Sequence, residues 1–517
     1  MVMRGMQYRD DPSTFESEHS YVEKVWVDPE IGPDELLRET TPELIDEDAG
    51  CANPLPTETI GPYRTPESRK LVTEEEEVLR PLVERGLYPG FLEAGPRELL
   101  RLDPCTARAA IVAVGGTAPG TNAVIHAIVR RHTRYVEASV ERWEQRGRQG
   151  QRPACTGRLL GFLNGFEGLM ARQPWPSAAV PGPMELTLAD TAGWRDTAGC
   201  QLGLSRYDFS AGDLVHQAAE NVIAADLDIV YVIGGDGGMQ GAKRLWEALR
   251  KHPKGLDVSV VGIPKTMDND IGWARHSLGH GTALAEAARI LNVLHTDAKA
   301  NRRVMLVELF GADAGFVTAG AALASGKADL VLIREEAFDP WKTVAYIAKQ
   351  TREAGCALVV MAEGALSSLG KRLVGEKLIE LPKPSTTMLR DPWYERRDLH
   401  DAALKWLRDA LRSEFGRPAV FTGHVVVNQP GYLIRAVPPS AEDIIHAERL
   451  GDQAVDSALA GYTGFMITQW QTHYVMVPLP LVVAVERRVG TEGAFWREVV
   501  SSTGQPSLAS SDEDSSA

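Results

Sequence analysis

A single carboxylate, that of Asp236, stands inside a cluster of glycines in VIGGDGGMQGA, the stretch from Val232 to Ala242. An apolar run precedes the cluster and an amphipathic segment follows it, which predicts a strand, a glycine-rich turn and a helix. The stretch AVGGTAPGTNAVI, from Ala113 to Ile125, has the same arrangement. Such turns present unpaired backbone N–H groups and the positive end of a helix dipole to an anion. One such turn alone also fits a plain tight connection, and neither stretch has Walker or dinucleotide spacing.

The segment GIPKTMDNDIGW, from Gly262 to Trp273, offers Lys265, Thr266, Asp268 and Asp270 after an apolar run. This is the carboxyl end of a predicted strand, where open α/β sheets bind ligands. If the segment is extended, Asp268 and Asp270 point to the same side, so that one takes a proton while the other helps to hold a metal ion. The alternative is an Asx-rich turn that caps the following helix.

Together, the three segments predict a site for phosphoryl transfer. Glycines allow a polyphosphate to lie against the backbone, and the lone Asp236 can hold Mg²⁺ against the phosphate oxygens. Phosphoryl transfer needs alignment and charge neutralisation more than covalent catalysis, so this set of residues suits it.

Short apolar segments that alternate with amphipathic segments are expected to form the strands and helices that position these residues. From Ala109 onward, AAIVAV, LDIVYVI and LDVSVVGI are each followed by a helical pattern, and a second series contains NRRVMLVELF, ADLVLI, ALVVMAEG and PAVFTGHVVV. Short, fully apolar strands that alternate with helices predict parallel strands covered on both faces. The sequence therefore predicts an α/β protein with two Rossmann-like three-layer domains, mostly parallel sheets and an N-terminal extension.

Composition excludes several classes of protein. The chain has 517 residues, of which 44% are hydrophobic and 24% charged, enough for two or three domains. Its formal charge of −15 argues against a general nucleic-acid binder. Neither a signal peptide nor an apolar run of about 18 residues is present, so no membrane contact and a cytoplasmic location are expected. The five cysteines are widely spaced, which disfavours disulfides and zinc sites.

Six motifs occur in the order expected of the phosphofructokinases: GGTAPGTN, GGDGGMQGA, PKTMDNDI, VMLVELFGADAGF, AEGA and PGYLIRAVPPS. The resemblance covers roughly residues 85–480. FLEAGPRELLRLDP, LAGYTGF and the N-terminal extension resemble the clade of plant and trypanosomatid ATP-dependent enzymes. The resemblance implies the glycolytic phosphorylation of fructose 6-phosphate at its 1-hydroxyl to give fructose 1,6-bisphosphate, with ATP as co-substrate and Mg²⁺ as cofactor.

The resemblance also implies roles for residues on the nucleotide side. Asp268 would be the general base that takes the proton from the 1-hydroxyl, and Thr266 would contact the transferred phosphate. Asp236 and Asp270 would hold Mg²⁺ directly or through water. The remaining members of the catalytic and nucleotide-binding sets are Arg206, which would reach the γ-phosphate, Lys265, and the glycines Gly116, Gly235, Gly237, Gly238 and Gly241.

On the sugar side, the resemblance implies that Glu363 of AEGA binds sugar hydroxyls and that Tyr432 and Arg435 of GYLIR hold the 6-phosphate. Arg303 would come from a neighbouring subunit, so a homo-oligomer, a dimer or an allosteric homotetramer with a shared sugar-phosphate site, is expected. Phe310 and Gly311, with Thr266 and Asp268, complete the substrate-binding set.

The family pattern also bears on the phosphoryl donor. Pyrophosphate-using relatives carry Asp where this chain has Gly237, and the absence of a side chain there favours ATP. Lys265 is the opposing signal because pyrophosphate users carry Lys there, but the resembling ATP-dependent clade combines this Lys with this Gly. Pyrophosphate-dependent transfer therefore stays an alternative to ATP.

Three positions depart from the family pattern. Ala312, in FGA, replaces the arginine of the MGR motif, HVVVNQ lacks a second cation for the sugar phosphate, and Gly238 stands where a hydroxyl residue is common. Loss of a charge-stabilising arginine can cost about 10³-fold in rate when it acts as an arginine finger, and Lys265 is a candidate to compensate. A catalytically impaired or regulatory relative that binds another sugar phosphate is therefore a further alternative.

The expected domain boundaries follow from these assignments. Residues 368–398 lack a clean period and are predicted to form a loop-rich insertion, and polar residues 500–517 are predicted to be a disordered tail. The predicted parts are an N-terminal extension of short helices and loops at 1–100, a nucleotide-binding α/β domain at 101–285 completed by part of 436–485, and a sugar-phosphate-binding α/β domain at 286–435.

Overall fold

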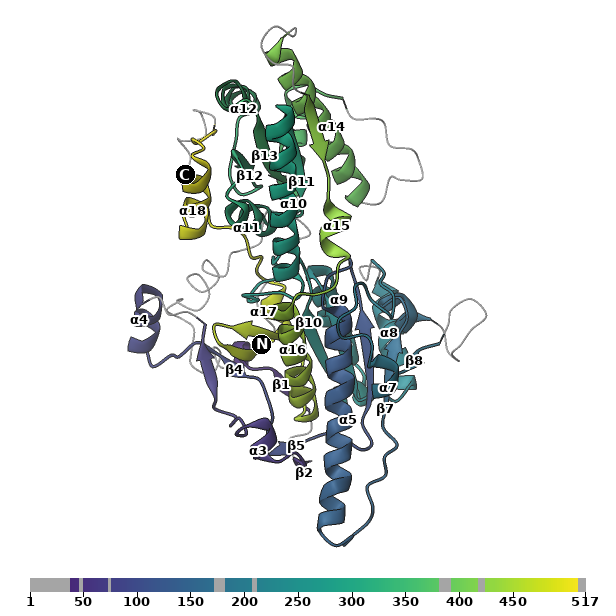
Figure 1. Cartoon of the computed structure of the whole chain (residues 1–517). Coiled ribbons are helices and arrows are strands. Elements are labelled where there is room, and N and C mark those ends of the chain that lie inside the picture. The colour runs from purple at the N-terminus through teal and green to yellow at the C-terminus, as the bar shows by residue number, and fades with distance from the viewer. Residues whose placement is uncertain are drawn as a thin grey trace. The chain divides into compact units, whose positions relative to one another are not determined.

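The computed structural model describes residues 38–45, 50–72, 76–171, 182–206, 212–380, 392–416 and 424–509. The chain forms two compact units, each with a sheet and surrounding helices (Figure 1). Unit 1 comprises Met1–Thr266, Ile271–Gly279 and Ala436–Arg487. Unit 2 comprises Met267–Asp270, His280–Arg435 and Arg488–Ala517.

Within the described residues, unit 1 contains a nine-stranded sheet in the order β3-β4-β17-β16-β10-β9-β6-β7-β8. The five central strands, from β16 to β7, are parallel, and the flanking strands pair antiparallel. The strands are β3 (Arg69–Leu71), β4 (Gly90–Glu93), β6 (Arg108–Ala113), β7 (Arg158–Phe162), β8 (Met184–Glu185), β9 (Ile229–Gly234), β10 (Ser259–Pro264), β16 (Phe465–Trp470) and β17 (His473–Pro478).

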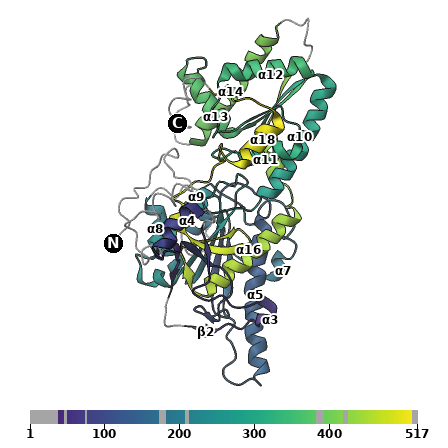
Figure 2. The same cartoon turned by 90° about the vertical axis from the view of Figure 1, so that its left-hand side faces the viewer.

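Alternating side chains of the central strands enter two separate cores, as the period of two in a strand requires. Ala110 and Val112 of β6 pack in the core that contains α8 (Gly212–Ala224) and α9 (Asp236–Leu249). Ala109 and Ile111 pack in the core that contains α5 (Thr121–Gln145) and α16 (Ala441–Leu459). The sheet is therefore the middle of three layers, and α5 and α16 lie side by side on one face (Figures 1 and 2).

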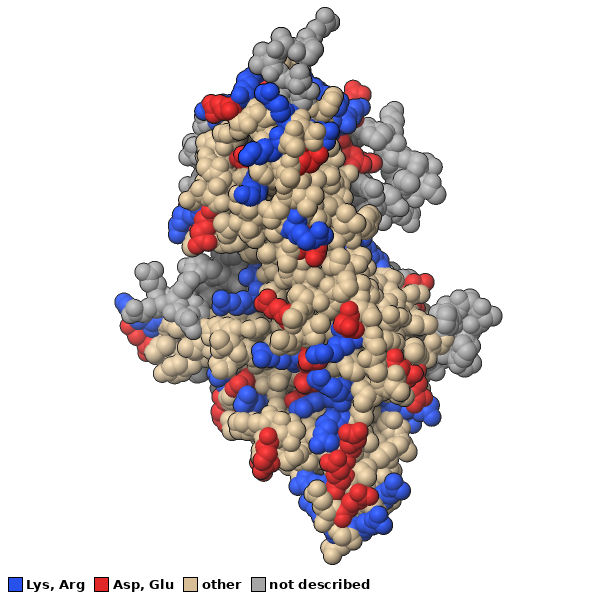
Figure 3. Space-filling view, in the orientation of Figure 1, with Lys and Arg blue, Asp and Glu red and all other residues tan. Residues whose placement is uncertain are grey.

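The face of unit 1 formed by α5 and α16 carries intermixed charges (Figure 3). Arg131 lies 2.7 Å from the buried Asp456, and Arg130 pairs with Asp452 at 3.0 Å. These pairs join the two helices across their contact.

The smaller elements of unit 1 are α3 (Thr57–Ile60), α4 (Glu76–Glu84), α6 (Phe166–Met170), α7 (Leu188–Thr191), α17 (Leu479–Val482), β1 (Glu43–Leu44), β2 (Cys51–Ala52), β5 (Leu99–Leu100) and β15 (Tyr462–Thr463).

The N-terminal region contributes more to the sheet than its sequence predicts. β3 and β4, from the expected extension of helices and loops, add two strands beside β17. These strands have three and four residues, too few to show a clear alternation. The pairing of β4 with β17, almost 400 residues later in the chain, places them in this sheet.

Unit 2, in its described part, has a four-stranded parallel sheet in the order β12-β13-β11-β14. Helices lie on both sides of it (Figure 2), and one continuous core joins helices and strands. The elements are β11 (Val304–Leu309), β12 (Leu330–Leu332), β13 (Ala357–Ala362), β14 (Val425–Asn428), α10 (His280–Asn301), α11 (Phe316–Ser325), α12 (Pro340–Ala354), α13 (Glu363–Gly375), α14 (Pro392–Phe415), α15 (Gly431–Arg435) and α18 (Ala494–Thr503).

The predicted α/β fold is confirmed, but two local predictions are wrong. The predicted insertion at 368–398 is helical at both ends, because α13 continues to Gly375 and α14 begins at Pro392. The predicted disordered tail is structured up to residue 509. α18 ends at Thr503, and the Gln505 side chain then hydrogen-bonds to both the backbone N–H and the carbonyl of Val331 in β12.

Among the described helices, none has the length and apolar character to cross a membrane.

Two buried histidines of unit 1 predict a loss of stability in acid. His132 lies 2.9 Å from the Tyr231 hydroxyl, and His446 lies between the carbonyl of His276 and the Tyr474 hydroxyl. Burial lowers the pKa of His132 to about 4. Burial, and then the charge of His276, lowers the pKa of His446 to about 4, against the opposing effect of Asp443.

Between pH 6.5 and pH 4 the unfolded chain therefore binds protons that the folded chain refuses, so the free energy of unfolding falls as the pH falls. Each histidine contributes on the order of 3 kcal/mol to this change. Urea unfolding of the parent and of His132→Gln and His446→Gln at pH 7 and pH 4.5 measures it. We expect a shallower pH dependence in both variants, and an unchanged dependence would contradict the prediction.

Candidate functional site

The two glycine-rich turns of the sequence follow neighbouring strands of unit 1. β6 and β9 pair in parallel with Ala113 opposite Ile233, so the turns at Gly115 and Gly235 lie at the same edge of the sheet. The strand after β6, β7, lies on one side of β6, and β9 lies on the other side. This reversal of strand order is the point where open α/β sheets form a ligand crevice.

The turn after β9 places Asp236 at the start of a helix. Gly235 is the N-cap of α9, and Asp236 is its first residue. The Asp236 carboxylate is exposed and accepts a hydrogen bond of 2.7 Å from the Gln240 side chain. An exposed carboxylate beside several backbone N–H groups can share a cation with a phosphate chain.

The glycines of this turn differ in what surrounds them. A Cβ at Gly237 would meet no atom within 4 Å, whereas a Cβ at Gly238 would lie 2.9 Å from Val114 and one at Gly241 would lie 2.5 Å from the Phe166 ring. Gly238 and Gly241 therefore allow α9 to pack closely against β6 and α6. Gly237 alone of these three leaves open space for a ligand, and direct phosphate contact by all three stays a prediction.

Lys265 connects the two turns. Its backbone N–H donates to the Gly234 carbonyl at 2.8 Å, and its Nζ donates to the Gly116 carbonyl. The side chain is only 2% exposed. Burial raises the pKa of the Cys200 thiol, and the charge of Lys265 opposes that rise. The structure thus holds a buried cation between the two anion-facing turns.

Thr266 and Arg206 lie at this same edge of unit 1. A Cβ at Gly235 would be 3.8 Å from the Thr266 Cβ. Arg206 follows Ser205, whose carbonyl accepts the Gly115 N–H at 2.9 Å, and its side chain is exposed. Unit 1 therefore gathers the predicted nucleotide-side residues around one edge of its sheet.

The D-N-D segment of unit 2 is not extended, so the condition under which Asp268 and Asp270 were expected to point to the same side is not met. Asn269 has a left-handed backbone with φ of 58°, and Asp268 lies in a bend. His280 holds the segment by donating from Nδ1 to the Met267 carbonyl at 2.7 Å. α10 starts only at His280, so the segment does not cap the next helix directly either. Both carboxylates are half-buried.

Three loops meet at the carboxyl edge of the unit 2 sheet, after β11, β13 and β14. Gly364 donates its N–H to the Gly311 carbonyl at 2.9 Å, which joins the first two loops. Gly311 has φ of 133°, a conformation that glycine adopts far more readily than other residues. Glu363 is the first residue of α13 and is half-buried. This edge is also a reversal point, since β12 and β13 lie on one side of β11 and β14 on the other.

The predicted 6-phosphate residues lie on α15 after β14. The Arg435 guanidinium stands 4.6 Å from the centre of the Tyr432 ring and 5.6 Å from that of Phe310. Tyr432 is 65% exposed. The structure therefore brings Phe310, Tyr432 and Arg435 together, with the guanidinium within cation–π distance of both rings.

Arg303 lies at the opposite edge of the same sheet. It precedes β11 and pairs with Asp297 at 2.8 Å. β11 has six residues and thus separates Arg303 from Phe310 by about 20 Å. Within one chain Arg303 does not join the other sugar-side residues, and its role in a neighbouring subunit stays a prediction.

A polar chain beside this edge was missed by the sequence analysis. Glu308, buried in β11, accepts a hydrogen bond of 2.6 Å from the Gln429 side-chain amide, and its other carboxylate oxygen lies 3.4 Å from Nδ1 of His400. Nε2 of His400 is in turn 2.6 Å from the Ser367 hydroxyl. The only local signal is one acidic residue in the otherwise apolar VMLVEL, and its partners come from α13, α14 and the end of β14. This network fixes Gln429 next to the α15 loop.

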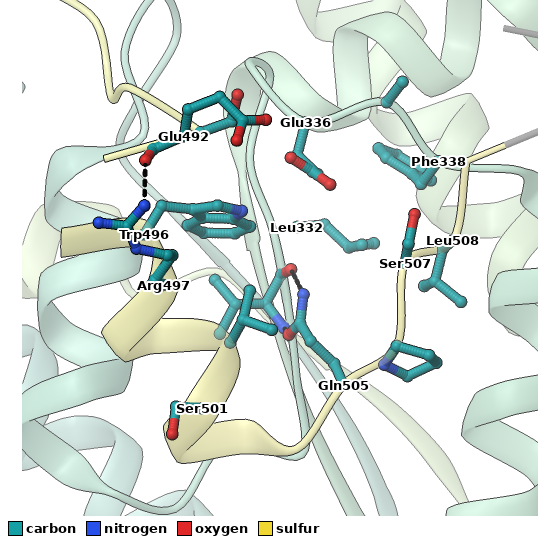
Figure 4. Close-up of a pocket in the computed structure, with 15 residues that line it drawn as sticks. Leu332, Glu336, Phe338, Glu492, Trp496, Arg497, Ser501, Gln505, Ser507 and Leu508 are labelled. Carbon is teal, nitrogen blue, oxygen red and sulfur yellow. Dashed lines mark hydrogen bonds between the residues drawn. The ribbon is translucent and has the colours of Figure 1, made fainter. Parts of the chain in front are cut away.

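A pocket of about 370 Å³ lies at a different place in unit 2, along β12, and is lined on another side by α18 and residues 505–508 (Figure 4). Trp496, Phe338 and Leu508 form apolar walls, and Glu336 and Glu492 supply carboxylates. Burial raises the pKa of Glu336, and the charge of Glu492 adds to that rise. None of the site residues predicted from the sequence lines this pocket.

Comparison with known proteins adds independent findings. The family model described as Phosphofructokinase matches residues 152–458. The ATP-dependent 6-phosphofructokinase of Amycolatopsis methanolica is 30% identical over 470 residues, which is 89% of this chain and 92% of that protein. ATP-dependent 6-phosphofructokinase 1 of Arabidopsis thaliana is 31% identical and aligns over 83% of this chain and 82% of its own length.

Solved structures show the same fold at lower identity. The pyrophosphate-dependent phosphofructokinase of Marinobacter aquaeolei gives a TM-score of 0.55 at 20% identity, over 78% of this chain and 92% of that one. The Pichia pastoris phosphofructokinase in the T-state gives 0.53 at 20% identity, over 73% of this chain and 35% of that one.

Proposed function

Because this chain belongs to the phosphofructokinase family, we propose that it transfers the γ-phosphoryl group of ATP to the 1-hydroxyl of fructose 6-phosphate. The products are ADP and fructose 1,6-bisphosphate. Relatives named ATP-dependent 6-phosphofructokinase, at about 30% identity over most of the chain, support ATP as the donor. The resemblance inferred from the motifs is thereby confirmed.

The observation that carries this function is the Lys265–Asp268 segment at the carboxyl end of β10. Lys265 and Thr266 belong to the edge of unit 1 that carries both glycine turns, and Asp268 belongs to unit 2. Covalent geometry limits the distance between the Cα atoms of Thr266 and Asp268 to about 7 Å. We therefore propose that Thr266 contacts the transferred phosphate and that Asp268, two residues later in the chain, acts as the base.

We propose Mg²⁺ as cofactor, with Asp236 and Asp270 as candidate protein ligands. Bound Mg²⁺ would neutralise phosphate charge. In the part of the chain that the structure describes, no three His, Cys, Asp or Glu side chains gather into a metal cluster. A Mg²⁺ that takes most of its ligands from phosphate and water needs no such cluster.

Turnover assays test the proposed function. Purified protein is incubated with fructose 6-phosphate and Mg²⁺, first with ATP and then with pyrophosphate, and fructose 1,6-bisphosphate is measured. We expect product with ATP. Product with pyrophosphate alone would establish the alternative donor. Binding of both substrates without product would identify a catalytically impaired relative.

Donor choice gives a sharper prediction at Gly237. Aspartate fits there because a Cβ meets open space, and an acidic residue in the first turn suits the helix dipole. Its charge would repel a nucleotide phosphate, so Gly237→Asp should lower kcat/KM for ATP about tenfold or more, equivalent to about 1.4 kcal/mol. Gly237→Ala adds the Cβ without charge and should stay close to the parent. Equal effects of Ala and Asp would show that charge at this position does not select the donor.

We also propose that the protein forms a homo-oligomer in which Arg303 of one subunit contributes to the sugar-phosphate site of its neighbour. Sedimentation of the parent and of Arg303→Ala measures their assembly, and the KM for fructose 6-phosphate measures substrate binding separately. The cytoplasmic location stays a prediction.

A further inference from the structure

We propose that Arg334 supplies the positive charge that the FGA segment lacks at Ala312, and that it stabilises the phosphoryl group during transfer. This inference rests on the proposed function. It assigns to the loop after β12 a role in the reaction that neither the motifs nor the comparisons place there.

The strand order puts the two positions next to each other. β13 lies between β12 and β11, and the loops that follow all three strands leave the same edge. Gly364, just after β13, separates the loops. A Cβ at Gly364 would lie 2.5 Å from the Ala312 carbonyl oxygen and 3.0 Å from the Arg334 Cβ. Ala312 and Arg334 are thus neighbours across a single glycine.

The Arg334 side chain reaches back toward the FGA loop. Its Nη1 donates to Oδ1 of Asp313, the residue after Ala312, at 2.6 Å. Both side chains remain 25% exposed, so the pair borders solvent-accessible space. A guanidinium has five N–H donors, so an Arg held by one carboxylate still has donors to offer a phosphate.

The backbone beside Arg334 is firmly held. Oε1 of Glu335 accepts N–H groups from Gly315 and Val489, each at 2.9 Å. These bonds tie the loop after β12 to the loop after β11. A cation fixed in advance contributes more to the transition state than one that must be ordered during reaction.

The chemistry of transfer requires such a cation. As the terminal P–O bond of ATP breaks and the bond to the sugar oxygen forms, negative charge spreads over the oxygens of the phosphoryl group. The unit 2 loops also bring carboxylates to this edge, those of Asp313 and Glu363, which repel phosphate unless a cation offsets them. Arg334, on the loop after β12, is the arginine that pairs with Asp313 and lies beside Gly364, the residue after Glu363.

The test measures kcat and KM with ATP and fructose 6-phosphate for the parent and for three variants. Arg334→Ala should lower kcat about 10²- to 10³-fold with a smaller change in KM, as for the loss of other preorganised donors. The double variant Ala312→Arg/Arg334→Ala should have a kcat at least tenfold higher than Arg334→Ala, because the new arginine places a cation on the other side of Gly364. A structural defect would not be repaired in this way.

Arg352→Ala is the matched control. Arg352 also pairs with a carboxylate, Glu414, but it lies at the end of α12, near the amino end of the sheet. It should leave kcat within twofold of the parent. The inference is overturned if Arg334→Ala keeps a near-parental kcat. It is also overturned if Arg334→Ala loses kcat and has a lower unfolding midpoint than the parent, and Ala312→Arg does not restore kcat.

A separate readout distinguishes this inference from the proposed function. Thermal shift with fructose 1,6-bisphosphate measures binding without turnover. If the parent makes no product, the proposed function fails, yet a weaker thermal shift in Arg334→Ala than in Arg352→Ala would still support a phosphate contact by Arg334. An equal shift in both variants would overturn that contact as well.

Discussion

Asp268→Asn is expected to lower kcat for fructose 6-phosphate by about 10²- to 10⁴-fold, the usual contribution of a general base. The amide has the size of the carboxylate but cannot accept the proton of the 1-hydroxyl. The backbone around it should persist, because His280 holds the segment through the Met267 carbonyl rather than through Asp268. Dissociation constants for both substrates should therefore change little.

Asp409→Asn on the exposed surface of α14 is the control for this prediction, and it should leave kcat unchanged. A pH profile adds a second readout, since the acidic limb of kcat should disappear with the carboxylate. Near-parental kcat in Asp268→Asn would remove this residue from the mechanism. The base would then have to be sought elsewhere in the unit 2 loops.

Lys265→Met is expected to cost about 10²- to 10³-fold in kcat/KM for ATP, because it removes a buried charge from between the two phosphate-facing turns. Methionine keeps much of the volume of the stem in a position that is 2% exposed. The Gly116 carbonyl loses its donor, which should also lower the free energy of unfolding by about 1–3 kcal/mol. Denaturant unfolding separates this structural loss from the catalytic one.

Two further variants make the result for Lys265 decisive. Lys265→Arg keeps the charge and should recover part of the activity if electrostatics dominate. Lys243→Met, on α9 where the half-buried Lys243 pairs with Glu247 at 2.8 Å, should have little effect. ATP turnover that survives in a folded Lys265→Met protein would leave the glycine turns without their proposed cation.

Sequence patterns were informative wherever short-range physics dictates structure. Six-residue strands such as β9 and β10 are buried along their whole length, and this burial favours apolar residues at nearly every position, with Ser259 at the start of β10 as a hydrogen-bonded exception. The glycine turns that follow β6 and β9 are specified by backbone conformations and close approaches that need glycine. Since parallel strands end at a common edge, the approximate gathering of Asp236, Lys265 and Thr266 followed from the pattern alone.

The tertiary structure decided features that depend on residues far apart in the chain. Asn269 adopts a left-handed conformation that invalidates the argument from extended geometry, and β3 and β4 exist because β17 offers an edge. Arg334 illustrates the same limit, because in the sequence it is merely the residue after ADLVLI. It becomes a neighbour of Ala312 only when β13 inserts between β12 and β11 and Gly364 leaves room. Strand order is set by packing over the whole unit, and no local pattern of residues encodes it.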